Sequence, residues 1–170
     1  MNKKAIVISA FPGCGKTYYF NHHRDDIKVL DSDSSQFSWI YHEDGTKERN
    51  PDFPNNYIQH IKDNMDKQDI IFVSSHEQVR QALRGIPLVI VFPSLSMKDE
   101  WRQRLIDRGS PIEFVKLVMD NWNTWISNIW TCDDDVPLYK YRLTDEHPYL
   151  DKYVIDQITN DVKCIDGFNV

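Results

Sequence analysis

One loop near the start of the chain restricts its fold more than any other stretch. The apolar run Ala5-Ile6-Val7-Ile8 predicts a buried strand, and Ala10-Phe11-Pro12-Gly13-Cys14-Gly15-Lys16-Thr17 follows it. The two glycines allow consecutive backbone N–H groups to turn toward one anion without obstruction by a Cβ atom. The start of the following helix adds the positive end of its dipole. A strand, a glycine turn and a Lys-Thr pair that opens a helix are the layout of a phosphate-binding loop.

The loop matches the pattern Gly-x4-Gly-Lys-Ser/Thr except at its first position, which is Ala10. Alanine fits there if its φ angle is negative. In such a loop Lys16 reaches the β- and γ-phosphates of a nucleotide, and the Thr17 hydroxyl holds Mg²⁺. The predicted cofactor-binding residues are Gly13, Cys14, Gly15, Lys16, Thr17 and Tyr18.

The size and composition of the chain suit one globular domain over residues 1–170. Its 41% hydrophobic and 27% charged content is ordinary for such a domain, and no run approaches the roughly 20 apolar residues of a membrane span. Met-Asn-Lys-Lys leads directly into a strand, so we expect no signal segment and a cytoplasmic location. The net charge of −6 does not favour a nucleic-acid partner, although a local basic site would be compatible with it.

The three cysteines contain no Cys-x-x-Cys pair, which fits a reducing compartment. Cys14 lies where a helix N-terminus lowers the pKa of a thiol. We therefore expect a thiol reagent to inactivate the protein and bound ATP to protect it. The alternative is that Cys14 is only a small loop residue.

A second apolar run, residues 27–33, ends in Val29-Leu30-Asp31-Ser32-Asp33. This sequence predicts a short strand that brings Asp31 and Asp33 to the sheet edge where ligands bind in open α/β folds. The interpretation is that Asp31 lies near Mg²⁺ and that Asp33 accepts the proton of an incoming hydroxyl or orients the acceptor. The alternative is a helix N-cap. Because the third strand, residues 70–75, has Ser74 where many phosphate-loop enzymes have an Asp, Asp31 is the candidate metal ligand.

Residues 34–68 interrupt the alternation of strands and helices. Two prolines keep residues 49–56 largely non-helical, and a helix is predicted over 57–65. This insertion is a candidate acceptor-binding lobe, in which a base or ring stacks on Trp39 or Phe53 and Arg49 binds a phosphate. The equally favoured alternative is a surface excursion whose aromatic side chains pack on the core.

A fourth strand over residues 87–93 is followed by a predicted helix over 98–108 that carries several basic residues. Arg102, Arg104 and Arg108 are candidate catalytic residues of a lid over about 94–112, because arginines there would neutralise charge on a transferring group. The alternative is an ordinary charged helix in which Glu100 pairs with Arg104. The remaining pattern predicts a helix over 110–130, a strand over 139–144 and a last helix from 145–148 onward, with the turn at 143–144 near a purine.

With these features the chain resembles the P-loop small-molecule kinases, which include nucleoside monophosphate, shikimate and polynucleotide kinases. It also looks like the small nucleotide kinases that bacteriophages encode, for which the location would be the host cytoplasm. The resemblance covers nearly the whole chain, and residues 11–17, 29–33 and 101–109 carry it. It implies a three-layer α/β fold with a five-stranded parallel sheet in the order 2-3-1-4-5, helices on both faces, and ATP and Mg²⁺ as cofactors. Ala10 departs from the family pattern, and residues 34–68 match no acceptor lobe by motif.

The leading hypothesis is phosphoryl transfer from ATP to a nucleotide, a deoxynucleoside monophosphate. Lys16, Asp33 and one or more of the arginines would be catalytic. A phosphate acceptor is already anionic and needs no base, so Asp33 also supports a second hypothesis, a hydroxyl acceptor: a nucleoside, a DNA end, a modified base or a small metabolite. A third hypothesis is an ATP-binding regulatory module with slow hydrolysis.

Overall fold

A five-stranded parallel sheet forms the centre of the molecule in the computed structural model, which describes residues 4–23, 26–132 and 138–165. Its three central strands are near-continuous apolar runs, as expected of strands covered on both faces. Their order is β2-β5-β1-β6-β7, which becomes 2-3-1-4-5 when only these strands are counted, and the predicted topology is confirmed. The strands are β1 (Ile6–Ala10), β2 (Val29–Asp31), β5 (Ile70–Ser74), β6 (Leu88–Pro93) and β7 (Leu138–Leu143).

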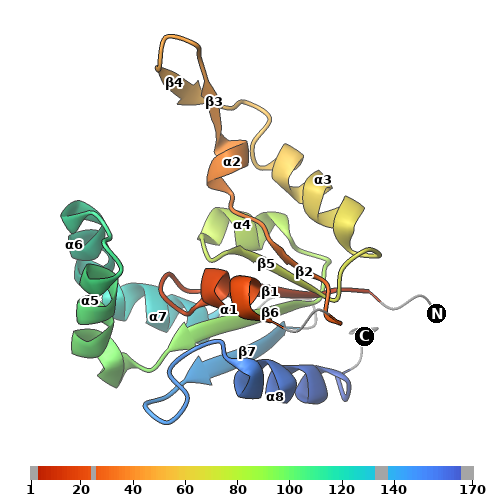
Figure 1. The fold of residues 1–170 in the computed structure, drawn as a ribbon, viewed down its shortest axis with the longest axis vertical. Coiled ribbons are helices and arrows are strands. Elements are labelled where there is room, and N and C mark those ends of the chain that lie inside the picture. Colours follow the sequence, from red (N-terminus) through yellow and green to blue (C-terminus); the bar gives the residue numbers. More distant parts are fainter. Residues whose placement is uncertain (1–3, 24–25, 133–137, 166–170) are drawn as a thin grey trace.

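Helices cover both faces of this sheet and give a three-layer α/β fold (Figure 1). Right-handed crossovers between parallel strands force successive helices onto opposite faces when the chain reverses direction across the sheet. α1 and α8 lie on one face, and α4 and α7 lie on the other. Their bounds are α1 (Lys16–His22), α4 (Glu77–Ala82), α7 (Trp122–Thr131) and α8 (Lys152–Val162). Within the described residues, no helix has the length and apolar character needed to cross a membrane.

The insertion after β2 leaves the sheet and then returns to it. It contains α2 (Ser35–Ser38), an antiparallel hairpin of β3 (Trp39–Tyr41) and β4 (Lys47–Arg49), and α3 (Asn55–Asn64). The hairpin projects beyond the body of the molecule (Figure 1). α3 buries Tyr57, Ile58 and Ile61, as its spacing predicts. The hairpin was not predicted, because its strands are too short to show a period of two.

The segment between β6 and β7 forms three helices rather than the predicted two. A 3₁₀ turn (η1, Leu95–Met97) leads into α5 (Lys98–Asp107), and Gly109, with φ +80°, follows the end of α5. The single helix expected over 110–130 is wrong: it is divided into α6 (Ile112–Asp120) and α7 at Asn121. The division allows Trp122 to be fully buried, with its indole N–H donating to the Leu95 carbonyl at 3.1 Å.

The last helix starts later than predicted. α8 begins at Lys152, and the Asp151 carboxylate accepts the Val154 N–H at 2.8 Å as its N-cap. Residues 145–148, expected to open the helix, instead belong to a loop over residues 144–151. An earlier aspartate, Asp145, offers the same local capping signal, but Leu150 is fully buried in the loop that precedes the helix. Tertiary packing therefore chooses between the two caps.

Candidate functional site

Every backbone carbonyl from residue 10 to residue 15 accepts a hydrogen bond from the protein. In chain order the donors are Lys16 Nζ (3.2 Å), the Cys14 N–H (3.1 Å), Trp101 Nε1 (2.7 Å), Arg104 Nη1 (3.3 Å), the Leu150 N–H (2.8 Å) and the Tyr19 N–H (2.9 Å). An anion that approaches the loop therefore meets no unpaired carbonyl dipole. Because three of these donors come from α5 and the 144–151 loop, distant parts of the chain fix the shape of the loop.

In contrast to the carbonyls, two amide N–H groups of the same loop make no hydrogen bond within the described part of the chain. Gly13 and Gly15 adopt left-handed backbone angles, with φ +90° and +97°. Their N–H groups donate to no acceptor in the described part of the chain, and the first-turn amides of α1 have no acceptor inside the helix. A Cβ atom at residue 13 would lie 2.9 Å from Trp101 Nε1, so only glycine fits under this side chain. Ala10 is tolerated because no described residue other than glycine has a positive φ. The loop is thus a ready-made anion nest.

Lys16 crosses the mouth of this nest. Its ammonium group donates to the Ala10 carbonyl at the other end of the loop. Burial lowers the pKa of Lys16, and the carboxylates of Asp31 and Asp33 oppose that shift while the Arg108 guanidinium adds to it. A desolvated ammonium group next to unpaired amides gains strongly from a bound polyanion. Lys16 therefore stands where the sequence predicted it.

Thr17 and Asp31, the two residues predicted to hold Mg²⁺, contact each other. The Thr17 hydroxyl donates to Asp31 Oδ2 at 2.9 Å. Adjacent oxygens in an octahedral Mg²⁺ shell with ligand distances of about 2.1 Å lie about 3 Å apart. The two side chains therefore fit one Mg²⁺, which would take further ligands from water and phosphate. Among the described residues no cluster of three or more His, Cys, Asp or Glu could hold a metal ion alone.

A cavity of about 610 Å³ opens on the amide side of the loop, and we call it the donor cavity. Its remaining walls come from α5 and from the loop before α8. Tyr149 and Asp151, which sequence reasoning did not single out, replace the predicted contact from residues 143–144. The N-cap of α8 at Asp151 could have indicated these residues, but the start of the helix was predicted too early in the chain. The lining residues are Gly13, Gly15, Lys16, Thr17, Tyr18, Arg104, Arg108, Tyr149 and Asp151.

Arg104 connects three walls of the donor cavity: the phosphate loop, α5 and the loop before α8. Its guanidinium lies between the rings of Trp101 (4.0 Å) and Tyr149 (3.9 Å), and it donates to the Gly13 and Pro148 carbonyls. It also pairs with Glu100 at 2.6 Å, as the ordinary-helix interpretation expected. With 9% of its side chain exposed, Arg104 makes these bonds through Nη1 and Nη2, whereas its buried Nε has no hydrogen-bond partner among the described residues. We conclude that it positions the loop.

The other two predicted arginines lie on different faces of α5. Arg108 lines the donor cavity, donates to Ser110 Oγ at 2.7 Å, and has its pKa lowered by partial burial. Arg102 is exposed and lines a separate hollow between α5 and α6. The structure therefore places Arg108 at the donor cavity and leaves Arg102 away from it. Trp101 and Leu105 are fully buried, so the α5 part of the predicted lid belongs to the core in this conformation.

No family model matches this chain, and no curated protein matches it in sequence. Among solved structures, it is similar to a gluconokinase from Sinorhizobium meliloti 1021, with 11% identity and a TM-score of 0.44. The match covers 95% of this chain and 97% of the gluconokinase. These values are too low to carry an activity across, so function has to be argued from the site itself.

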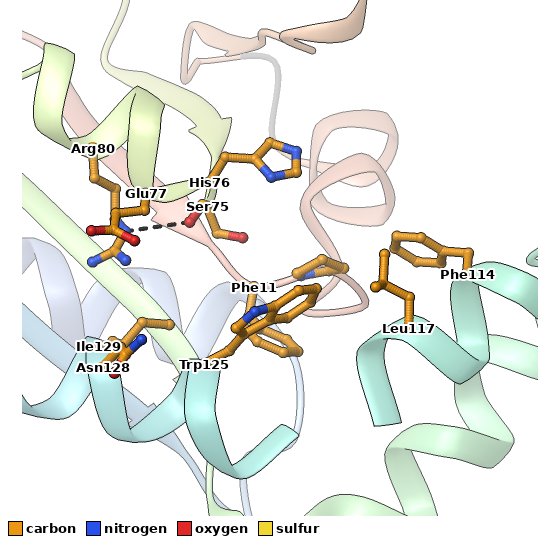
Figure 2. A pocket seen from close by; sticks show the side chains of 11 residues that line it. Phe11, Ser75, His76, Glu77, Arg80, Phe114, Leu117, Trp125, Asn128 and Ile129 are labelled. Carbon is orange, nitrogen blue, oxygen red and sulfur yellow. Dashed lines mark hydrogen bonds between the residues drawn. The ribbon is translucent and has the colours of Figure 1, made fainter. Parts of the chain in front are cut away.

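A second, smaller cavity of about 190 Å³ adjoins the loop on the side of Phe11 and Pro12, and we call it the side cavity (Figure 2). His76 lies on its wall. Burial lowers the pKa of His76, the charges of Lys16 and Arg49 lower it further, and Asp33 opposes them. These interactions indicate that His76, Lys16, Asp33 and Arg49 share one electrostatic neighbourhood.

Asp33 contacts the start of α2, and its predicted role toward an acceptor stays a prediction. One carboxylate oxygen accepts the Ser35 N–H at 2.9 Å at the start of α2, which is the capping alternative. The side chain is nevertheless exposed and close enough to Lys16 and His76 to affect both pKa values. Asp33 thus has a fixed carboxylate near the phosphate loop.

Of the three predicted acceptor residues in the insertion, two lie together and Phe53 lies apart from them. Trp39 and Arg49 are cross-strand partners in the hairpin, and the guanidinium lies 4.5 Å from the Trp39 ring centroid. Lys47 Nζ lies at the same distance from that ring. Phe53 instead packs beside Tyr57, with a centroid distance of 6.3 Å, against the core. Phe53 therefore packs on the core, as the alternative interpretation expected.

The reactivity predicted for Cys14 is wrong. Its side chain is fully buried, its thiol donates to the Val91 carbonyl at 3.8 Å, and burial raises its pKa to about 12. Lys16 and Arg104 oppose that shift but do not overcome it. The thiol points into the sheet, while the backbone of residue 14 belongs to the nest. Desolvation of the thiol therefore raises its pKa by more than the helix dipole lowers it.

Proposed function

We propose that this chain is an ATP- and Mg²⁺-dependent kinase that transfers a phosphoryl group to a nucleotide, a deoxynucleoside monophosphate. The observation that carries the proposal is the phosphate loop. Its carbonyls at residues 10–15 are all hydrogen bonded to the protein, while the Gly13 and Gly15 amides, beside Lys16, have no acceptor among the residues that the structure describes. Such a nest binds phosphates whatever the acceptor is, and the donor cavity beside it has the volume of a cofactor site.

The residues of this chain divide the work of phosphoryl transfer. Loop amides and Lys16 hold the donor phosphates, and Arg108 faces the charge that develops on the transferring group. Thr17 and Asp31 would hold Mg²⁺, which when bound neutralises phosphate charge. Asp33 orients the acceptor. Little covalent chemistry is required of the protein, so positioning and fixed charge account for most of the rate.

A matched pair of arginines on α5 tests this assignment. Arg108→Ala should lower kcat by roughly 10²- to 10³-fold in an ATP-consumption assay with a panel of deoxynucleoside monophosphates, because one preorganised charge is removed. Arg102→Ala, on the same helix but away from the donor cavity, should stay within about 2-fold of wild type. Equal effects of the two substitutions would refute the role of Arg108.

A hydroxyl acceptor is the second candidate, and the fixed Asp33 carboxylate near Lys16 favours it. If Asp33 is a general base, Asp33→Asn should lower kcat by roughly 10²- to 10⁴-fold. With a phosphate acceptor the loss should be far smaller, since no proton has to be removed. If ATP binds tightly but no acceptor stimulates its turnover, the chain is instead an ATP-binding regulatory module.

A further inference from the structure

We propose that the side cavity binds the base of the acceptor, and that the acceptor is a pyrimidine nucleoside or its monophosphate. The proposal rests on the proposed function, since it names the substrate that a kinase with this phosphate loop would use. It places the acceptor ring against α6 and α7 rather than in the 34–68 insertion.

The position of the side cavity suits a second substrate. Phe11 and Pro12 belong to the phosphate loop and line the side cavity, whereas the donor cavity begins at Gly13. The two cavities therefore flank the same loop. A phosphoryl group held by Lys16 would lie between a donor on one side and an acceptor on the other, as direct transfer requires.

The walls of the side cavity are suited to a flat ring. Phe11 and Trp125 meet edge to face at a centroid distance of 6.3 Å, and Phe114 lies across the opening (Figure 2). Aromatic rings attract the faces of other rings, including those of nucleobases. A volume of about 190 Å³ is below the roughly 300–1,000 Å³ of sites that enclose a whole drug-sized ligand. The cavity thus accommodates one small ring and leaves the attached sugar outside.

Polar groups gather at one end of this apolar space. Figure 2 shows Arg80, Glu77 and Asn128 there, with Phe114 and Leu117 at the other end. The Asn128 side chain offers both a donor and an acceptor, the combination needed to bind the edge of a base. Arg80, 9% exposed, donates to the Ser75 carbonyl and so keeps this end of the cavity in shape. A polyol would leave the aromatic walls unused.

The side cavity also connects to the reacting groups through His76. This residue lines the cavity and interacts electrostatically with Lys16 and Asp33. A ring bound against Phe11 would therefore direct its sugar or phosphate past His76 toward the phosphate loop. The insertion offers no comparable ring site, because cations lie over the Trp39 ring and Phe53 packs beside Tyr57.

The test compares Phe114→Ala and Asn128→Leu with Ile112→Ala, an exposed α6 residue outside the side cavity. Calorimetry measures binding of thymidine, cytidine, dTMP and dCMP in the presence of a non-hydrolysable ATP analogue, and a coupled assay measures turnover. We expect Phe114→Ala to weaken binding of the preferred probe by roughly 5- to 150-fold, the range for loss of one base–aromatic contact. The Kd for the ATP analogue should stay within about 2-fold, and Ile112→Ala should change neither value.

The outcomes separate this proposal from the proposed function. If the ATP analogue binds and an acceptor is used, but the side-cavity variants bind it normally, the side-cavity proposal is overturned and the kinase assignment survives. Use of a purine or polyol acceptor in place of all four pyrimidine probes has the same consequence. Failure to bind the ATP analogue at all overturns the proposed function itself. Preference between nucleosides and monophosphates shows which oxygen accepts the phosphoryl group.

Discussion

The phosphate loop and the β3–β4 hairpin are attached to the molecule in opposite ways. Each carbonyl of residues 10–15 is hydrogen bonded, and side chains from α5 reach 89 and 91 residues back along the chain to make two of these bonds. The hairpin is held together by its own pairing and by contacts of Lys47 and Arg49 with Trp39. The difference indicates that phosphate binding depends on a shape set before the ligand arrives, whereas the hairpin remains accessible for contacts at the surface.

The largest expected effect removes the charge of the loop while its backbone stays in place. Lys16→Ala should lower kcat/KM by on the order of 10³–10⁵-fold, comparable to the loss of a cation that stabilises phosphoryl transfer. Lys62→Ala, at an exposed position of α3, is the matched control and should have no effect. Steady-state kinetics with ATP and the preferred acceptor measure both. Substantial residual turnover in Lys16→Ala would contradict the phosphate-loop assignment.

The next largest effect concerns the hydrogen bonds through which Arg104 holds the phosphate loop. Arg104→Ala removes two carbonyl contacts, two ring contacts and the partner of Glu100, and it should cost about 3 kcal/mol of unfolding free energy. Arg102→Ala should change that free energy by less than about 0.5 kcal/mol, since its side chain is exposed. Urea unfolding measures both variants.

Activity separates the two interpretations of Arg104. If it positions the loop, Arg104→Lys should weaken ATP binding more than it lowers kcat at saturating ATP, because lysine has no planar group to lie against the Trp101 and Tyr149 rings while it bonds the loop carbonyls. A pure loss of kcat, with ATP binding intact, would assign Arg104 to the transition state instead.

The parts that could be predicted from sequence are those whose chemistry is local. The glycines, Lys16 and Thr17 lie within one turn, and the central strands are apolar runs, so the loop and these strands followed from the residues. The order of the sheet was implied by the resemblance to P-loop kinases. Asp31 was found because a carboxylate at the end of a strand next to such a loop has few other uses.

The parts that failed depend on contacts between distant segments. Nothing near Asn121 marks the end of a helix, yet the division of 110–130 there accompanies the burial of Trp122 and the side cavity beside Trp125. The contact of Tyr149 with Arg104 likewise depends on which aspartate caps α8. Local signals name candidates, and packing selects among them.

A smaller effect tests the corrected view of Cys14. Burial raises the pKa of its thiol in the folded protein to about 12, whereas an unfolded thiol titrates at about 8.5. Between these values the folded state keeps a proton that the unfolded state has lost, so stability falls as pH rises. This group should contribute a slope of about 1.4 kcal/mol per pH unit above about pH 9.

The slope is measured by urea unfolding between pH 8 and pH 10. Cys14→Ala should lose this contribution, while the exposed Cys164→Ala should keep it. Iodoacetamide at pH 8 should leave Cys14 unmodified with or without ATP, as mass spectrometry of the peptides would show. Rapid modification of Cys14 that nucleotide prevents would restore the first interpretation.

The smallest effect concerns the hairpin and the charge of the acceptor. The charge of Arg49 lowers the pKa of His76, although β4, which carries Arg49, is exposed. An exposed ion pair is worth roughly 0.2–1 kcal/mol. Arg49→Ala should therefore raise KM for a monophosphate acceptor by only about 1.4- to 5-fold and leave KM for a nucleoside unchanged. Lys47→Ala is the control on the same strand, because no effect of Lys47 on His76 accompanies that of Arg49. An equal change for nucleoside and monophosphate would mean that the hairpin acts through folding rather than through charge, and Trp39, which Arg49 covers, would then be the residue to examine for direct contact with the ligand.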